Sequence, residues 1–124
     1  MELSGLVRVL AKERAQLETL VLRLQVLARL IEAGDDRLLP IASDDVERAT
    51  AAVRSTELQR ALLVAQLAAD LGVPPDSLTL RGMVTVAPSP WRPVLADHRW
   101  ALLRLVADVE AAAAACRVAE PVRG

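Results

Sequence analysis

The chain has 124 residues, a formal net charge of −1 and 53% hydrophobic residues, with no Phe and no Tyr. This length predicts a single domain over residues 1–124, and the scarcity of aromatic residues favours closely packed helices over a β-sheet. The balanced charge offers no basic stripe to phosphates, and one Cys with one His excludes an intrachain disulfide and a Cys/His zinc site, so neither nucleic acid nor zinc is expected.

Residues 2–33 are predicted to form one long helix. Leucine or isoleucine recurs every seven residues in the pattern of a helix that packs along another helix, at Leu3, Leu10, Leu17, Leu24 and Ile31. Glu13 is the one interruption of the companion positions, and Gly34 follows where a helix-ending glycine belongs. The frequent charges after Glu2 do not fit a signal peptide, and no apolar run approaches the roughly 18 residues of a membrane span. We therefore expect a cytoplasmic protein without membrane insertion.

A second long helix is predicted over residues 44–71. Pro40 is expected to hold Leu39 in an extended conformation, and Asp44 with Glu47 has the spacing of a capping box. The segment GVPPD then breaks the helix. The second half of this helix, LQRALLVAQLAADL, is apolar over much of its circumference, which is typical of a helix with more than one neighbour.

The segment 76–90 has two interpretations. Asp76 or Ser77 could cap a short helix that runs through about Met83, whereas LTLRGMVTV also fits two short strands around Gly82. The short helix is favoured, because a lone hairpin is only marginally stable in water.

A third long helix is predicted over residues 92–119. Pro93 fits the first turn of a helix, and a second seam recurs every seven residues at Leu95, Leu102, Val109 and Cys116. Together these elements predict an all-α fold. The expected architecture is an elongated antiparallel helical bundle of three main helices plus a short connecting segment.

His98 raises the possibility of a histidine phosphotransfer domain. It lies seven residues from both Trp91 and Leu105, on the inward side of the seam, and a phosphate-accepting histidine must be exposed, so a structural role is favoured. Cys116 stands among alanines without a nearby histidine and is expected to be inert. Four aspartates flank the first turn without the spacing of a calcium loop: Asp35, Asp36, Asp44 and Asp45. We therefore expect no catalytic residue, cofactor or metal.

Trp100 begins a second apolar stripe on the third helix. It lies two residues before Leu102 and so points about 160° away from the seam. This stripe either packs on the second half of the second helix or binds the amphipathic helix of a partner. The candidate partner-binding residues are Trp91, Trp100, Leu103, Ala107, Ala111 and Ala114.

The order of these segments resembles the FlgN family of flagellar type III export chaperones. The resemblance covers about residues 3–118 and rests on LVRVLAKERAQLETL, TELQRALLVAQLAADLGVPPDSLTLRGM and LADHRWALLRLVADVEAA. It implies a small all-α protein without enzymatic activity. Such a protein binds hook-associated proteins of the hook–filament junction, keeps them unassembled and delivers them to the export gate. The family binds its clients with the C-terminal helix, which corresponds by position to the stripe from Trp100 to Ala114. The alternatives are a generic helical adaptor or homodimeric coiled-coil protein and, less favoured, the phosphotransfer domain.

Overall fold

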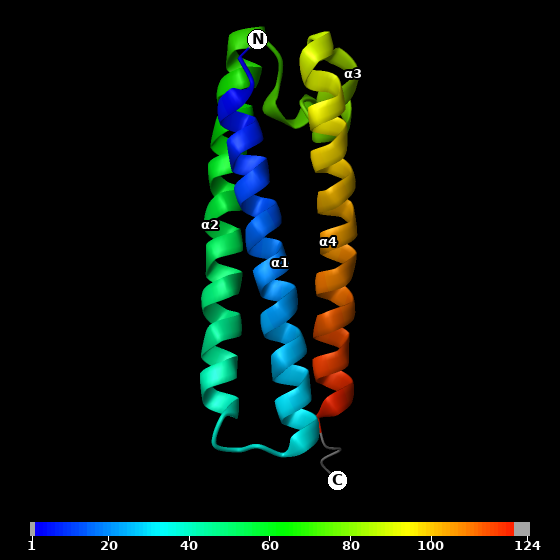
Figure 1. The fold of residues 1–124 in the computed structure, drawn as a ribbon. Coiled ribbons are helices and arrows are strands. Elements are labelled where there is room, and N and C mark those ends of the chain that lie inside the picture. The colour runs from blue at the N-terminus through cyan, green and yellow to red at the C-terminus, as the bar shows by residue number, and fades with distance from the viewer. Residues whose placement is uncertain (1, 121–124) are drawn as a thin grey trace.

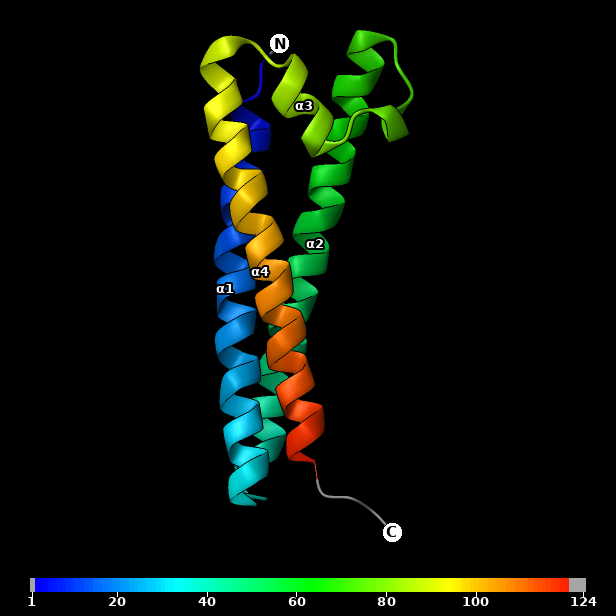
Figure 2. The same cartoon turned by 90° about the vertical axis from the view of Figure 1, so that its right-hand side faces the viewer.

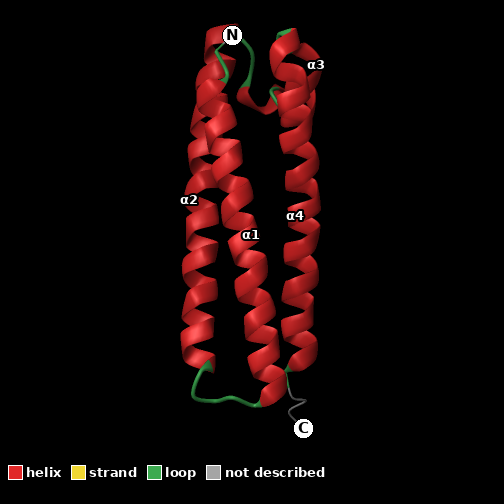
Figure 3. Ribbon diagram, viewed as in Figure 1, coloured by secondary structure: helices red, strands yellow, loops and turns green. Residues whose placement is uncertain are grey.

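The structure is a computed structural model and describes residues 2–120. These residues form helices and connecting turns without a strand, so the prediction of an all-α protein is confirmed (Figure 3). The elements in order are α1 (Ser4–Ala33), α2 (Leu39–Leu71), the 3₁₀ turn η1 (Pro75–Ser77), α3 (Leu80–Val86), the 3₁₀ turn η2 (Ser89–Trp91) and α4 (Arg92–Ala119).

The long helices α1, α2 and α4 lie lengthwise, with α2 running opposite to α1 and α4 (Figure 1). α1 packs extensively against both α2 and α4. Within the described residues, α2 and α4 have few close backbone contacts with each other, and α3 lies between their ends nearest the N-terminus (Figure 2). α1 is therefore the element on which both other long helices are built.

The core follows the two predicted seams. The buried side chains on α1 include Leu6, Leu10, Leu17, Leu20 and Leu24, and those on α4 include Leu95, Leu102, Leu105 and Cys116. Each fully buried leucine contributes roughly 1.5–3 kcal/mol to folding, so this seam holds the helices together. Leu27 and Ile31, near the end of α1, are only partly buried.

The ends of α1 and α2 correct the predicted boundaries. α1 begins at Ser4, because the carboxylate of Glu2 accepts a hydrogen bond from the Ser4 N–H at 2.6 Å and residue 2 precedes the helix. α2 begins at Leu39, so its predicted start at residue 44 is wrong. Pro40 lies in the first turn, where its missing N–H costs nothing, and Asp35 accepts the Leu38 N–H at 3.2 Å.

The connecting segment contains the favoured short helix, and the strand interpretation is wrong. α3 begins at Leu80 rather than next to Asp76, because the hydroxyl of Thr79 caps it by accepting the Gly82 N–H at 3.0 Å. Gly34 and Gly72 end α1 and α2 with φ of 64° and 69°, a left-handed conformation that costs other residues strain.

Candidate partner-binding surface

The outer face of α4 carries the predicted stripe in solvent. Trp100 is 65% exposed and Leu103 57% exposed, although both are large apolar side chains. Ala107 and Ala111 are also exposed, whereas Ala114 is partly buried. The interpretation in which this stripe packs on α2 is therefore wrong. The seam of α4 faces α1 and leaves the opposite face uncovered.

Arginines border the stripe at its larger side chains. Arg99, Trp100, Leu103 and Arg104 line a shallow hollow of about 450 Å³. The Arg104 guanidinium carbon lies 5.7 Å from the centre of the Trp100 ring, which is within the range of a cation–π contact. This hollow can receive an apolar side chain while the two guanidinium groups remain available to carboxylates.

Trp91 does not belong to this surface. It lies at the end of η2, where it is partly buried and packs against the hydrophobic core. The structure therefore brings together five of the six predicted residues on the outer face of α4 and places Trp91 on the seam side.

A second exposed apolar face lies on α2 and was not predicted as a site. Leu58 is 63% and Leu62 64% exposed, one helical turn apart. The sequence does indicate this face, because the second half of α2 is apolar over most of its circumference. That pattern was interpreted as contact with further helices of the same chain. Its two leucines are about as exposed as Trp100 and Leu103 of the α4 stripe.

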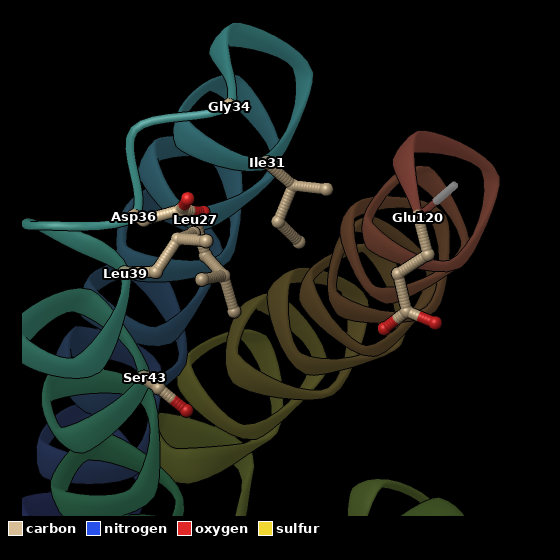
Figure 4. A pocket seen from close by; sticks show the side chains of 7 residues that line it. All are labelled: Leu27, Ile31, Gly34, Asp36, Leu39, Ser43 and Glu120. Carbon is tan, nitrogen blue, oxygen red and sulfur yellow. The ribbon is translucent and has the colours of Figure 1, made fainter.

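Further recesses lie elsewhere on the molecule. One, of about 800 Å³, lies where α4 ends, between Leu27 and Ile31 of α1, Leu39 of α2 and the carboxylate of Glu120 (Figure 4). A narrower one, of about 270 Å³, lies between α1, α2 and α3 and has Leu10 and other buried core side chains in its walls. The buried side chains in the narrower recess leave little area for contact, and the wider recess is lined by partly buried leucine and isoleucine side chains together with the exposed Asp36 and Glu120. Neither recess therefore presents large exposed apolar side chains as the stripe does.

A polar layer crosses the core between α1 and α2. Glu13 is 4% exposed, and its Oε1 lies 3.0 Å from Nη1 of Arg60 without the geometry of a hydrogen bond. Burial raises the pKa of Glu13, the Arg60 charge lowers it and nearby Glu57 raises it further. The Thr56 hydroxyl and the side-chain carbonyl of Gln16 are buried without a hydrogen-bond partner among the described residues. This layer weakens the α1–α2 interface.

His98 is buried on α4, as its position in the seam predicted. Nη1 of Arg14 lies 3.2 Å from its Nδ1 and 3.0 Å from Oδ2 of Asp97. Since arginine only donates, Nδ1 is the acceptor and Nε2 carries the proton. Burial and then the Arg14 charge lower the pKa of His98, against the opposing effect of Asp97. A buried, neutral imidazole already bound to arginine is poorly placed to accept phosphate.

Cys116 is also buried, and its Sγ donates to the Leu24 carbonyl oxygen at 3.2 Å. Burial raises the pKa of the Cys116 thiol, with a further contribution from Glu120, so the reactive thiolate is disfavoured. Across residues 2–120, no three His, Cys, Asp or Glu side chains gather in a group that could hold a metal ion. Over the same span, none of the helices combines the length and apolar character needed to cross a bilayer.

No known protein family, characterised protein or solved structure matches this chain. The resemblance to the FlgN family therefore rests on the quoted sequence segments alone.

Proposed function

We propose that this protein is a cytoplasmic chaperone of flagellar export. It holds amphipathic terminal helices of hook-associated proteins on the outer face of α4, prevents their premature assembly and brings them to the export gate. The scaffold is an elongated antiparallel helical bundle of three main helices plus the short connecting segment. In this scaffold α4 is anchored to α1 by its seam and presents the stripe on its opposite face.

The exposure of Trp100 and Leu103 carries this proposal. Large apolar side chains in solvent, on a regular helical face, mark protein-interaction surfaces. Tryptophan is the side chain most enriched among residues that dominate binding energy. A second amphipathic helix can lay its own apolar stripe along such a face, with the alanines allowing close approach of the two backbones.

The test is co-purification of the chain with the terminal helices of candidate hook-associated proteins. The double variant Trp100→Ala with Leu103→Ala should weaken binding about thirtyfold or more, since truncating one dominant contact costs about 2 kcal/mol. Its stability should change by less than about 1 kcal/mol, because both side chains are exposed.

The matched control is Leu58→Ala with Leu62→Ala on α2, which removes apolar side chains of similar exposure from another face. The control should bind its client as the unaltered chain does. Equal binding by all three proteins, with helicity intact by circular dichroism, would exclude the α4 face as the binding site. Failure of every hook-associated helix to bind would exclude the flagellar assignment.

A further inference from the structure

The stripe of α4 is unequal along its length in both size and charge. Its first half carries Trp100 and Leu103 between Arg99 and Arg104, whereas its second half carries Ala107 and Ala111 between Asp108 and Glu110. Among the described residues, none of these four charged side chains forms an ion pair within the chain. Large side chains with positive borders therefore precede small side chains with negative borders on the same exposed face.

Such a face is complementary to itself when turned end for end. In a twofold-symmetric antiparallel pair of helices, residue i of one helix faces residue j of the other and the reverse, about one common midpoint. Two pairs of stripe residues share nearly the same midpoint along the sequence, between residues 104 and 106: Trp100 with Ala111, and Leu103 with Ala107. One symmetry axis near Leu105 therefore places each large side chain opposite a small one.

The charged residues at the borders of the stripe fit the same twofold axis. At about 100° per residue, Arg99 and Glu110 lie on one border of the stripe and Arg104 and Asp108 on the other. This symmetry keeps each border beside the same border of the second copy. The pair of Arg99 and Glu110 has its midpoint between residues 104 and 105, and the pair of Arg104 and Asp108 has its midpoint at residue 106, each within about one residue of the apolar midpoints. Size and charge thus select one register independently.

From these two coincidences we infer that the stripe binds a second copy of this chain. The two α4 helices pair antiparallel about Leu105, with Trp100 over Ala111 of the second copy and Leu103 over its Ala107. Arg99 and Arg104 pair with Glu110 and Asp108 of the second copy. A single helix pair forms a small interface, so the dimer is weak and concentration-dependent. This inference does not rest on the proposed function. If both hold, the second copy covers the stripe until a client helix displaces it.

The experiment measures the mass of the full chain by light scattering and sedimentation from about 1 μM to 1 mM, a range that covers weak association. The dimer should form within this range. Asp108→Arg alone should raise its Kd about tenfold or more, since symmetry converts two ion pairs into two repulsions. Arg104→Asp alone should do the same, and both changes in one chain should restore the dimer. Arg54→Asp on α2, an exposed charge reversal outside the stripe, should leave the Kd unchanged.

Three results would overturn the inference. The first is a monomer at every concentration. The second is a dimer that the single reversals do not weaken, or that the double reversal does not restore. The third is a dimer that only Leu58→Ala with Leu62→Ala disrupts, which would place the contact on α2. A monomer that still binds hook-associated helices would refute the dimer and retain the proposed function. A dimer that binds no hook-associated helix would support the dimer and refute the proposed function.

Discussion

Replacement of Glu13 by leucine should stabilise the fold. Glu13 occupies a seam position of α1 where every neighbouring seam residue is apolar, and its carboxylate is almost fully buried. Its ion-pair partner, Arg60, keeps 35% of its side chain in solvent and can hydrate when the pair is lost. Removing Glu13 therefore leaves no buried unpaired charge, the condition that makes loss of one partner costly elsewhere.

The size of the effect follows from two contributions. Burying a leucine side chain at this position gains roughly 1.5–3 kcal/mol, and losing a pair with a partly exposed arginine costs at most about 1 kcal/mol. The Glu13→Leu variant should therefore be more stable by about 2 kcal/mol. A chain of this length should then melt about 8 °C higher.

The pH dependence gives a separate check. Because burial raises the pKa of Glu13 above its ordinary 4.5, the folded state keeps this proton at pH values where the unfolded state has lost it. The contribution of Glu13 to stability therefore falls as pH rises from 4.5 through the folded-state pKa, and the advantage of the leucine variant should grow over the same window.

Urea unfolding followed by circular dichroism, at several pH values, measures both quantities. Glu18→Leu is the control, because Glu18 is exposed on the same helix and its replacement should change stability by less than about 0.5 kcal/mol. A leucine variant that is less stable than the original at pH 7 would show that the Glu13–Arg60 pair is a net stabiliser and would refute this reasoning.

Three further predictions concern other positions. The original chain should lose stability as pH falls below 6.5, because the pKa of His98 is lowered in the folded state and the unfolded state therefore takes up the proton first. The His98→Asn variant should not show this loss. Urea titrations of both proteins at about pH 7 and pH 5 would contradict the prediction if both lost equal stability. Cys116 should react with a thiol reagent at least about tenfold more slowly in the folded chain than in urea, because it is buried with a raised pKa; equal rates would refute this placement. Gly72→Ala should destabilise the fold by about 1–2 kcal/mol, because the left-handed φ of 69° strains any side chain. Gly5→Ala, which lies within α1, should stabilise the fold by about 0.5–1 kcal/mol through the higher helix propensity of alanine. Melting temperatures that shift in the same direction for both variants would contradict this.

The sequence predicted the helical seams well, because burial of one face imposes a period that is visible in the residue order. Leu10, Leu17 and Leu102 are buried as their spacing requires. The start of α2 was missed because proline has two opposite meanings, disruptive inside a helix and favourable in its first turn. The hydrogen bonds that Asp35 accepts from the Leu38 and Leu39 N–H groups mark the first-turn case here, and they depend on the path of the loop.

The candidate site was predicted only in part. Periodicity showed that Trp100 and the seam lie on opposite faces, but it does not determine whether another helix covers the second face. That depends on the separation of α2 from α4, which is a tertiary property. Trp91 was included because the third helix ends early, which favoured a contact shifted toward the start of that helix, although its spacing to His98 is that of the seam.

The central position of α1 has a consequence for the order of folding. α1 and α2 are joined by a short turn and can pair early, whereas the contact of Arg14 with Asp97 spans 83 residues and closes the chain over most of its length. Slow, non-local closure of this kind should make α4 the last element to dock during folding. Once docked, α4 packs on α1 at least as extensively as α2 does and buries more of its side chains, so its backbone amides should exchange with solvent deuterium no faster than those of α2.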